Sequence, residues 1–529
     1  MHGGKSTKVK AAEARGAAST ETELKLVVPP VMLASVAAAP VVERHARNRG
    51  TVRLLRAVYY DTADRALWRA GFTLRVRRQG GAHMLTVKSK GPAGGDMLSR
   101  REWEAPVAGA EPDLSPLAAD LPGAFHEALG EAGLEPVFAT RVRRRARRLD
   151  LAGASIEMAV DEGEVVAGAL RAPVSEIELE LLSGRAEALY EVALGLLEAG
   201  PADISFRSKA VQGFDLAFGA VPGWTKAGRT PIEAEAPLDE AFAAMLGAAL
   251  RHLIDNKAAA LDGSDPEGVH QLRVALRRLR SILRIVARAT GADGVAAFGD
   301  DARWLASAAG DARNWDVFLA ETLPPIEAVC AGPEGFVALR RAAEERRARG
   351  YGEICAALAD IRAQRFQIAL ALWIERRGWR IGGAAHALET LAGPASHHAA
   401  QVLHGLDRKV LKRGRRFTKM TAEERHELRL AVKKLRYATD FLMPLCASGR
   451  KMTAYAKGLS RLQDGLGRFN DMATTLSLVT ELRADGGGVD IVDACGVVRG
   501  WLAHANEATE AELRDVWVAF AQLRRPWPA

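Results

Sequence analysis

The stretch Glu21-Thr22-Glu23-Leu24-Lys25, near the N-terminus, decides the fold of the first part of the chain. Because side chains alternate between the two faces of a β-strand, Glu21, Glu23 and Lys25 share one face. Thr22 and Leu24 share the other face, which suits apolar packing. Taken alone, the pattern is typical of an ordinary solvated strand. Two carboxylates beside an ammonium group also suit a metal–phosphate site, so the later strands decide between the two interpretations.

Further short segments with period-2 alternation follow, separated by Gly, Pro or Asp turns. On one face they carry Arg75 and Arg77, Thr86 and Lys88, Glu102 and Glu104, Arg141 and Arg143, Glu157 and Asp161, and finally Glu176, Glu178 and Glu180. Solvated sheet faces usually mix signs, since like charges placed opposite each other destabilise a sheet. Here acids and bases are segregated by strand. We therefore expect the charged faces to converge on an ionic cavity with an apolar outer wall.

Such a cavity needs a ligand, because burying this much unpaired charge is prohibitive. Carboxylates are hard oxygen ligands that suit Mg²⁺ or Mn²⁺, while arginine forks and lysine ammonium groups suit phosphate oxygens. Phosphoryl transfer depends mainly on positioning and charge neutralisation, so it requires no Ser, Cys or His nucleophile. The residue types predict a site for a phosphate chain together with divalent cations.

The same residues resemble the CYTH domain, the family of triphosphate tunnel metalloenzymes. Glu21-Thr-Glu23-Leu-Lys25 is similar to its ExExK signature, and the resemblance continues through Tyr60-Asp-Thr62, Arg75-Val-Arg77, Thr86-Val-Lys88, Arg100-Arg-Glu102-Trp-Glu104, Arg141-Val-Arg143, Asp161-Glu-Gly163, Glu176-Ile-Glu178-Leu-Glu180 and Ser208-Lys209. The family includes inorganic triphosphatases, thiamine triphosphatases and a class of adenylyl cyclases, so the resemblance leaves the substrate open.

The resemblance implies an α+β domain built on an eight-stranded antiparallel β-barrel tunnel. It implies Mg²⁺ or Mn²⁺ bound by Glu21, Glu23, Asp161, Glu176 and Glu178. It implies a triphosphate held by Lys25, Arg75, Arg77, Lys88, Arg141, Arg143 and Lys209. Among these residues, Lys25, Arg75, Arg77 and Glu178 are expected to serve catalysis.

The bulk sequence sets the domain plan. The chain has 529 residues and a formal net charge of +8, which favours polyanionic partners. Its four cysteines form no CxxC pair, which favours neither a disulfide framework nor a zinc site and suits a reducing cytosol. No signal peptide or membrane span is expected. We expect a disordered basic tail (1–20), the tunnel domain (21–217), a linker (218–236) rich in Gly, Pro, Thr and Ala, and a helical domain (237–525).

The helical part contains an internal repeat. Val269-His270-Gln-Leu-Arg273-Val-Ala-Leu-Arg277-Arg-Leu-Arg280 resembles Arg425-His426-Glu-Leu-Arg429-Leu-Ala-Val-Lys433-Lys-Leu-Arg436, 156 residues later. We therefore expect an all-α domain of two pseudo-symmetric helical bundles. His270, Arg273, Arg277 and Arg280 share one helical face, as do His426, Arg429, Lys433 and Arg436. Residues 269–290 and 408–419 contain no acid, and the second segment adds Lys412 and Arg416, which favours a polyanion-binding surface over a simple solvated face.

This part resembles the CHAD domain, the conserved histidine α-helical domain often fused to CYTH. The resemblance rests on the two His-x-x-Arg helices and on two Asn-containing turns, around Asn314 and Asn470. It implies binding of inorganic polyphosphate by His270, Arg273, Arg277, Arg280, Lys412, Arg416, His426, Arg429, Lys433 and Arg436.

The sequence thus predicts a metal-dependent inorganic triphosphatase that cleaves tripolyphosphate to diphosphate and phosphate, with a helical domain that binds polyphosphate. The expected location is the cytoplasm, with docking on polyphosphate granules as one role of the helical domain. Two alternatives stay open: hydrolysis of an organic triphosphate such as thiamine triphosphate or a nucleotide, and a non-catalytic protein that binds polyphosphate or nucleic acid. Nucleic acid is the less favoured partner, because aromatic side chains do not interleave with the basic helices.

Overall fold

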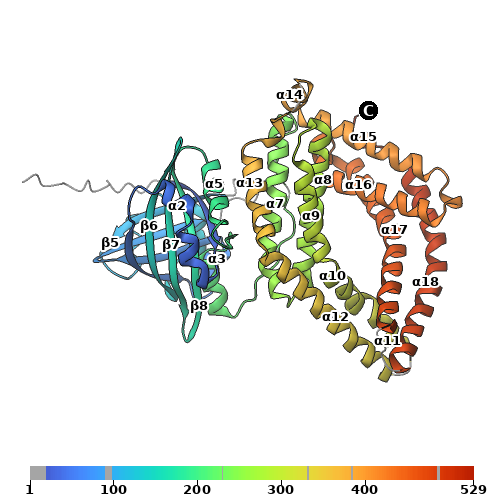
Figure 1. Cartoon of the computed structure of the whole chain (residues 1–529), viewed down its shortest axis with the longest axis horizontal. Helices are drawn as coiled ribbons and strands as arrows, with labels where there is room; N and C mark the ends of the chain where they lie inside the picture. The colour runs from blue at the N-terminus through green and yellow to red at the C-terminus, as the bar shows by residue number, and fades with distance from the viewer. Residues whose placement is uncertain are drawn as a thin grey trace, which may run out of the picture. The chain divides into compact units, whose positions relative to one another are not determined.

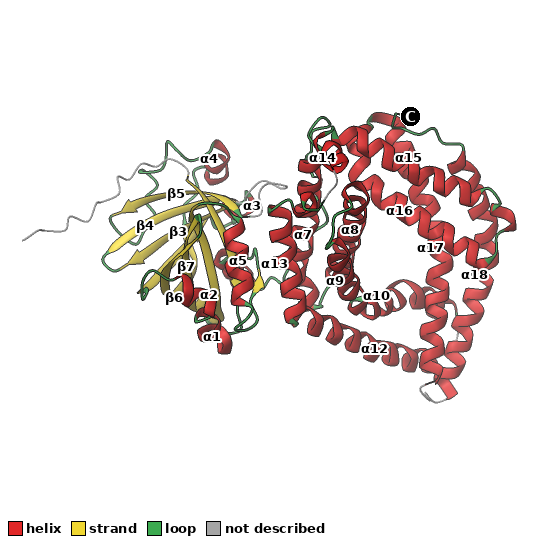
Figure 2. Ribbon diagram, turned by 45° about the horizontal axis from the view of Figure 1, so that its top comes forward, coloured by secondary structure: helices red, strands yellow, loops and turns green. Residues whose placement is uncertain are grey.

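The computed structural model describes residues 19–89, 98–228, 230–330, 333–382, 385–484 and 489–528. The predicted tail lies outside this range except for its last two residues. The chain divides into two compact units, Met1–Val221 and Pro222–Ala529. The first is built on an antiparallel sheet and the second is entirely helical in its regular structure, as Figure 1 and Figure 2 show. The predicted order, an antiparallel β domain followed by an all-helical domain, is confirmed.

The sheet of the first unit has nine antiparallel strands in the order β5-β4-β3-β2-β6-β7-β8-β1-β9, and β1 also pairs with β5. The strands are β1 (Ser19–Val27), β2 (Thr51–Asp61), β3 (Phe72–Gln79), β4 (Ala82–Ser89), β5 (Ser99–Val107), β6 (Glu135–Leu151), β7 (Ala154–Ala167), β8 (Leu170–Ser183) and β9 (Asp203–Ile204). The expectation of eight strands therefore misses one, because the two residues of β9 pair with Leu26 and Val27.

The uncharged face of the sheet packs against short helices, as the alternation predicts. Leu24 of β1 is 1% exposed, and the outward side chains of β3, β4 and β5 form a core with residues of the following loop and α4. The helices of this unit are α1 (Leu33–Ala37), α2 (Pro40–His45), α3 (Ala66–Arg69), α4 (Gly123–Leu129), α5 (Glu187–Leu196) and α6 (Lys209–Phe218), preceded by a 3₁₀ turn, Pro30–Met32. The opposite face, termed here the charged face, carries Glu21, Glu23 and Lys25.

The last helix of the unit, α6, is fixed in place by aromatic packing. Phe214 stacks on Trp68 with ring centroids 4.3 Å apart and meets Phe138 edge-on at 5.3 Å. Gly213 allows this approach, because a Cβ atom there would lie 2.0 Å from the Phe138 ring. The Ser208 hydroxyl caps the helix by accepting a hydrogen bond from the Val211 amide at 3.3 Å. The first residue of α6, Lys209, is thereby held at a defined place.

Asp61, at the end of β2, organises the turn into α3. Its carboxylate is fully buried and accepts hydrogen bonds from the backbone amides of Thr62 at 2.7 Å, Leu67 at 3.0 Å and Trp68 at 3.0 Å. A buried carboxylate is stable only when it is bonded in this way. The Tyr60-Asp61-Thr62 motif is therefore structural in this chain.

The helical unit contains α7 (Leu238–Asp262), α8 (Pro266–Thr290), α9 (Val295–Ala308), α10 (Gly310–Val317), α11 (Leu323–Val329), α12 (Pro333–Ala359), α13 (Ile361–Glu375), α14 (Ala385–Ala392), α15 (Ala395–Gly414), α16 (Ala422–Cys446), α17 (Gly449–Ala484) and α18 (Val489–Ala521). Short π or 3₁₀ segments lie at Phe318–Thr322, Gly378–Arg380 and Phe417–Lys419. The two basic repeats fall in α8 and α16, whose bounds differ by 156 residues at both ends (422 − 266 and 446 − 290).

One expectation for this unit needs correction. Asn314 and Asn470 lie within α10 and α17, so the predicted turns are helical. The predicted linker is partly bound to the helical unit: the Trp224 indole donates to Asp265 at 2.7 Å, and Asn256 of α7 exchanges hydrogen bonds with Thr225 at 2.9 and 3.0 Å. In the part of the chain that the structure describes, no helix has the length and apolar character needed to cross a membrane.

Candidate active site

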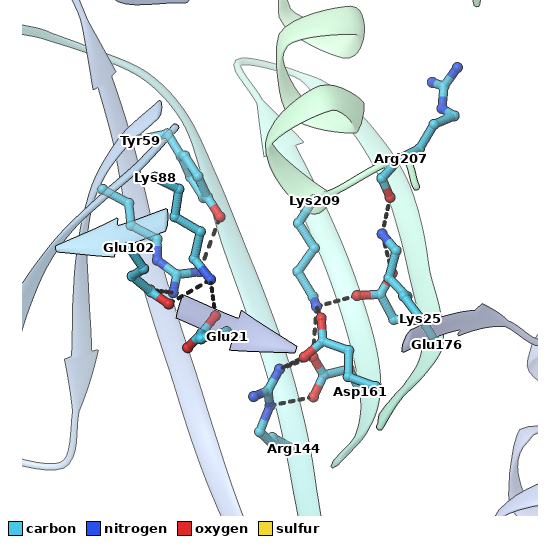
Figure 3. A network of polar contacts seen from close by, with 12 residues as sticks. Glu21, Lys25, Tyr59, Lys88, Glu102, Arg144, Asp161, Glu176, Arg207 and Lys209 are labelled. Carbon is cyan, nitrogen blue, oxygen red and sulfur yellow. Dashed lines mark hydrogen bonds and ion pairs between the residues drawn. The ribbon is translucent and has the colours of Figure 1, made fainter. Parts of the chain in front are cut away.

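Three carboxylates meet on the charged face of the sheet. Asp161 of β7 lies opposite Glu176 of β8, and Glu178 follows two residues later on the same face. Each side chain offers an oxygen within 4.8 Å of the other two. Asp161 is fully buried, and Glu176 and Glu178 are 2% and 15% exposed. We call these three side chains the carboxylate cluster; Figure 3 labels two of them, Asp161 and Glu176.

Three cations surround the carboxylate cluster. Lys209 Nζ lies 2.7 Å from Asp161 Oδ2 and 2.8 Å from Glu178 Oε1, and it also contacts Glu176. Arg144 forms a fork on Asp161, at 2.7 Å from Nε and 2.6 Å from Nη2, and contacts Glu178. Lys25 lies 3.5 Å from Glu176 Oε2 and donates a hydrogen bond to the Arg207 carbonyl.

These contacts set the charge state of the cluster. Burial favours the neutral form of Glu178, but the charges of Lys209 and Arg144 outweigh it and hold its pKa well below the usual value. The pKa of Lys209 is conversely raised well above the usual value, because its three acidic neighbours outweigh burial. Glu178 and Lys209 are therefore both charged at neutral pH.

A second ionic group lies on β1, β3, β4 and β5. Lys88 contacts Glu21 at 3.0 Å and Glu102 at 2.9 Å, and Arg75 lies 3.8 Å from Glu102. Burial, followed by a hydrogen bond with Glu21, raises the pKa of Glu102 to about 8. Burial opposes ionisation of Glu21 as well, yet the Glu102 hydrogen bond and the Lys88 charge lower its pKa. The pKa of Glu102 therefore lies above that of Glu21, so Glu102 is the partner that keeps its proton to higher pH.

Glu23 connects the two ionic groups. Burial, and then the charge of Glu178, raise its pKa to about 7, while Lys88, Lys209 and Lys25 act in the opposite direction. One side chain is thus close enough to interact electrostatically with cations of both groups. Arg75 also donates to the Tyr59 hydroxyl at 3.4 Å, and Arg77 lies 3.5 Å from Glu104. The Nε atoms of Arg75 and Arg77 are buried and have no hydrogen-bond partner among the described residues.

The donor set fits a hard divalent cation. Three carboxylates with oxygens inside 4.8 Å of one another match the oxygen-only preference of Mg²⁺ and Mn²⁺. The orphaned Nε atoms of Arg75 and Arg77 are donors that suit phosphate oxygens. The arrangement therefore provides both halves of a metal–phosphate site on one face.

Most of the predicted residues of this unit converge, and two do not. Glu21, Glu23, Lys25, Arg75, Arg77, Lys88, Asp161, Glu176, Glu178 and Lys209 all lie on the charged face. Arg141 and Arg143 point to the other face of β6, where they are 59% and 53% exposed and pair with Glu164 and Glu162. Their expected position on the charged face is wrong.

Arg144 takes the place expected for these two arginines. It pairs with Asp161 across β6 and β7 in the strand register, on the same face as the buried residues Thr140 and Val142. The run Arg141-Val142-Arg143-Arg144-Arg145 has arginines at both odd and even positions. Either set could therefore point to the charged face of the sheet. No local pattern separates Arg144 from its neighbours, because the strand register that pairs it with Asp161 decides which arginine lies on the charged face.

In the helical unit, α8 and α16 bring like charges together. Arg273 and Arg277 of α8 lie close to Arg429 and Lys433 of α16, and Arg313 of α10 joins them; we call these five residues the basic cluster. Burial, and then Arg429 and Arg277, lower the pKa of Lys433 to about 8, and burial with Arg277 and Arg313 lowers that of Arg273 to about 10. The Nε atoms of Arg277 and Arg429 are buried and find no acceptor among the described residues. The cluster is therefore short of negative charge.

The other predicted polyphosphate ligands are placed differently. His270 is half-buried next to the basic cluster, where burial and Arg313 lower its pKa, so it is neutral at pH 7. Arg280 lies near Arg284 and Arg303, and Arg436 pairs with Asp440. His426, Lys412 and Arg416 are exposed. No interaction described by the structure links these three to the basic cluster, whereas Lys409 and Arg413 of the same segment lie near Lys434. Sequence reasoning did not select Arg313 as a ligand.

Comparisons with known proteins agree with the two units. A model of the CYTH domain matches residues 19–210, and a model of the CHAD domain matches residues 244–480. An inorganic triphosphatase of Haemophilus influenzae is 31% identical over 198 residues, which is 37% of this chain and 54% of that protein. An uncharacterized protein of Mycobacterium tuberculosis is 30% identical over 285 residues, 50% of this chain and 52% of that protein. The chain thus spans about half the length of the curated relatives it matches.

A solved structure supports the second unit. The crystal structure of the CHAD domain from the plant Ricinus communis is 31% identical, with a TM-score of 0.51. The match covers 57% of this chain and 98% of the plant domain. The helical unit therefore has the fold of that domain.

Proposed function

The chain contains a CYTH domain and a CHAD domain, and from this premise we propose that it is a metal-dependent inorganic triphosphatase. The first unit hydrolyses tripolyphosphate to diphosphate and phosphate, and the second binds inorganic polyphosphate. The observation that carries the proposal is the meeting of Asp161, Glu176 and Glu178 with lysines and an arginine on the charged face. The name of the relative in Haemophilus influenzae supports the same activity.

In this proposal the eight long strands, β1 to β8, enclose a tunnel, and the pairing of β1 with β5 supports it. Glu21, Glu23, Asp161, Glu176 and Glu178 are the candidate ligands of Mg²⁺ or Mn²⁺. When bound, such a cation neutralises phosphate oxygens and lowers the pKa of a coordinated water. Glu178 belongs to both the metal and the catalytic set, because it lies in the carboxylate cluster and faces Lys209 and Arg144.

The cations of the charged face hold and orient the triphosphate. Arg75 and Arg77 project from neighbouring positions of one strand face and keep free Nε donors. Lys88 and Lys25 supply further point charges, and Lys25 is oriented by its bond to the Arg207 carbonyl. Together they stabilise the negative charge that develops on the leaving diphosphate. Arg144 acts on the carboxylates, whose positions it fixes.

The basic cluster of the helical unit is the candidate polyphosphate site. Its lowered pKa values and orphaned Nε atoms mean that an anion would relieve repulsion already present in the fold. Arg273, Arg277, Arg429 and Lys433 carry the proposal, together with Arg313. Attachment to polyphosphate granules in the cytoplasm stays a prediction.

Phosphate release from tripolyphosphate, ATP and thiamine triphosphate, each with Mg²⁺ or Mn²⁺, tests the catalytic part. We expect tripolyphosphate to be the best substrate and the double variant Glu176→Gln/Glu178→Gln to lose nearly all hydrolysis. Glu162→Gln is the matched control, because Glu162 lies on β7 but is 68% exposed on the other face. Hydrolysis that survives the double variant would show that the carboxylate cluster is not catalytic. Faster turnover of ATP or thiamine triphosphate than of tripolyphosphate would make an organic triphosphate the assigned substrate.

Competition between labelled polyphosphate and single-stranded DNA, at a stated salt concentration, tests the helical unit. We expect polyphosphate to bind more tightly and Lys433→Met to weaken that binding. Because both ligands are dense arrays of phosphate, the salt dependence alone does not separate them. Equal or tighter binding of DNA would make nucleic acid the partner of this unit.

A further inference from the structure

Lys209 lies among the three carboxylates of the cluster, although the resemblance to CYTH implies that it binds phosphate. Its ammonium nitrogen contacts Asp161, Glu176 and Glu178 together, with 2.7 Å to Asp161 and 2.8 Å to Glu178. Figure 3 shows Lys209 beside Asp161 and Glu176. These are the same three side chains whose oxygens lie close enough to share one cation. An ammonium group and a divalent cation bound to that group of oxygens would exclude each other.

We propose that Lys209 is the internal counter-ion of the carboxylate cluster, and that it leaves the three carboxylates when a divalent cation binds them and then contacts phosphate. The inference rests on the proposed function and adds to it the order of events at one side chain. It explains why Lys209, which is expected to bind phosphate, is found on carboxylates. Lys209 contacts the carboxylates when the site holds no metal ion and contacts phosphate when a divalent cation is bound.

The charge balance gives the exchange a consequence. Asp161, Glu176 and Glu178 are matched by Lys25, Lys209 and Arg144, so three negative charges face three positive ones. This balance leaves little net attraction for an anion. A divalent cation adds two positive charges while Lys209 stays nearby, tethered through its own backbone. The site then attracts a triphosphate more strongly, because net charge rather than the number of charged groups sets the local potential.

Lys209 is better suited to move than its two cationic neighbours. Arg144 grips Asp161 through two nitrogens in a planar fork, and Lys25 is tied to the Arg207 carbonyl. Lys209 is a point charge on a flexible four-carbon stem. Its backbone does not have to move, since α6 is fixed by the packing of Phe214 and Gly213 against Phe138. A change of side-chain rotamer is enough to release the ammonium group.

The test measures Mn²⁺ binding to the full-length, EDTA-treated protein by electron paramagnetic resonance, without substrate. We expect Lys209→Met, which keeps the length of the side chain and removes its charge, to bind Mn²⁺ about tenfold more tightly than the wild type. Lys209→Arg should bind Mn²⁺ more weakly, because a fork competes better for carboxylates. Lys25→Met is the matched control: it also removes a positive charge, but among the described residues Lys25 forms an ion pair only with Glu176, at 3.5 Å, so its gain should be smaller.

A second measurement separates exchange from simple repulsion. Binding is repeated with an imido-bridged triphosphate, which resists hydrolysis. In the wild type the analogue should tighten Mn²⁺ binding, and by reciprocity Mn²⁺ should tighten binding of the analogue. In Lys209→Met this mutual enhancement should shrink several-fold, because no ammonium group passes from carboxylates to phosphate. A lysine with only a structural role would leave the enhancement unchanged.

The outcomes are distinct. Equal Mn²⁺ affinity of Lys209→Met and the wild type overturns the inference and leaves the metal site intact. So does an equal gain in Lys25→Met, which would indicate general electrostatics. Absence of Mn²⁺ binding to the wild type would instead refute the metal part of the proposed function. If Lys209→Met does not fold, as judged by circular dichroism, Lys209→Arg decides, and unchanged Mn²⁺ affinity in that variant overturns the inference.

Discussion

Arg144→Met compared with Arg143→Met is the sharpest test of the fold and site together. The two arginines are neighbours on β6, yet they point to opposite faces. Arg144 forms a fork on the fully buried Asp161 and contacts Glu178. Arg143 is 53% exposed and makes one ion pair, at 3.8 Å, with the exposed Glu162. The same chemical change is thus made in two environments within one strand.

The magnitude follows from what each change leaves behind. Removing one partner of a buried ion pair costs about 3–5 kcal/mol, because the other charge stays buried. Asp161 keeps Lys209 at 2.7 Å, so we expect the low end of that range, about 3 kcal/mol, for Arg144→Met. An exposed pair contributes less than about 1 kcal/mol, so Arg143→Met should have little effect. Arg144→Lys should lie between them, since it keeps the charge and loses the fork.

Hydrogen exchange measured by mass spectrometry is the suitable assay for stability. Two compact units make a single unfolding transition of the whole chain unsafe to interpret, whereas exchange reports the opening free energy of each segment. Peptides from β6 to β8 should exchange faster in Arg144→Met only. Triphosphate hydrolysis should fall about a hundredfold in that variant, because displaced carboxylates cost catalysis steeply. Equal losses in Arg143→Met would refute the assigned strand register.

Three further predictions follow. The pKa of Glu23 is about 7 and that of Glu102 about 8, above the usual carboxyl range, so the folded state keeps protons that the unfolded chain has released. In EDTA, the first unit should therefore lose stability as the pH rises from about 5 to about 8.5, which the urea midpoints for hydrogen exchange of its peptides would measure. Mn²⁺ binding should strengthen over the same pH range. Asp61→Ala should destabilise the first unit by about 2–3 kcal/mol, because three backbone amides lose their acceptor. Asp64→Ala, at an exposed carboxylate, should not destabilise it. If urea unfolding monitored by hydrogen exchange ranks the two variants in the opposite order, the turn does not depend on Asp61. Lys433→Met should raise the thermal stability of the helical unit at low salt and lower its affinity for polyphosphate. Lys451→Met, at an exposed position, should change neither property. A loss of stability in Lys433→Met would contradict the repulsion assigned to the basic cluster.

The sequence predicted the charged face well where one residue class alternates with apolar residues. In Glu21-Thr-Glu23-Leu-Lys25 and Glu176-Ile-Glu178-Leu-Glu180 only one parity carries charge, so the buried Leu24, Ile177 and Leu179 fix the face. The rule failed on β6, where charge occupies both parities. There the phase depends on strand register, which pairs Arg144 with Asp161 and is not a local property of the sequence.

The helical site shows a second limit. Helical periodicity groups residues on one helix, and it correctly placed Arg273 and Arg277 on a shared face. It does not tell which helices meet. Arg313 enters the basic cluster from α10, while Arg280 lies near Arg284 and Arg303 and Arg436 pairs with Asp440, because packing between helices decides which charges are neighbours. The two histidines at equivalent positions of the repeat also differ, because His270 is half-buried and His426 is exposed. This difference results from helix packing and cannot be predicted from the sequence repeat.

The two sites solve the problem of concentrated charge in different ways. On the charged face of the sheet, carboxylates and cations neutralise one another, and pKa shifts of Glu178 and Lys209 reinforce their charged forms. In the basic cluster, the pKa shifts of Lys433 and Arg273 oppose the charged forms, because burial and the neighbouring cations outweigh the nearby acids Asp471 and Asp311. The first site therefore needs a cation before an anion gains from binding, whereas the second gains from an anion directly. Chelation of divalent metal should consequently abolish triphosphate binding by the β unit and spare polyphosphate binding by the helical unit, and sensitivity of both to EDTA would show that this distinction is wrong.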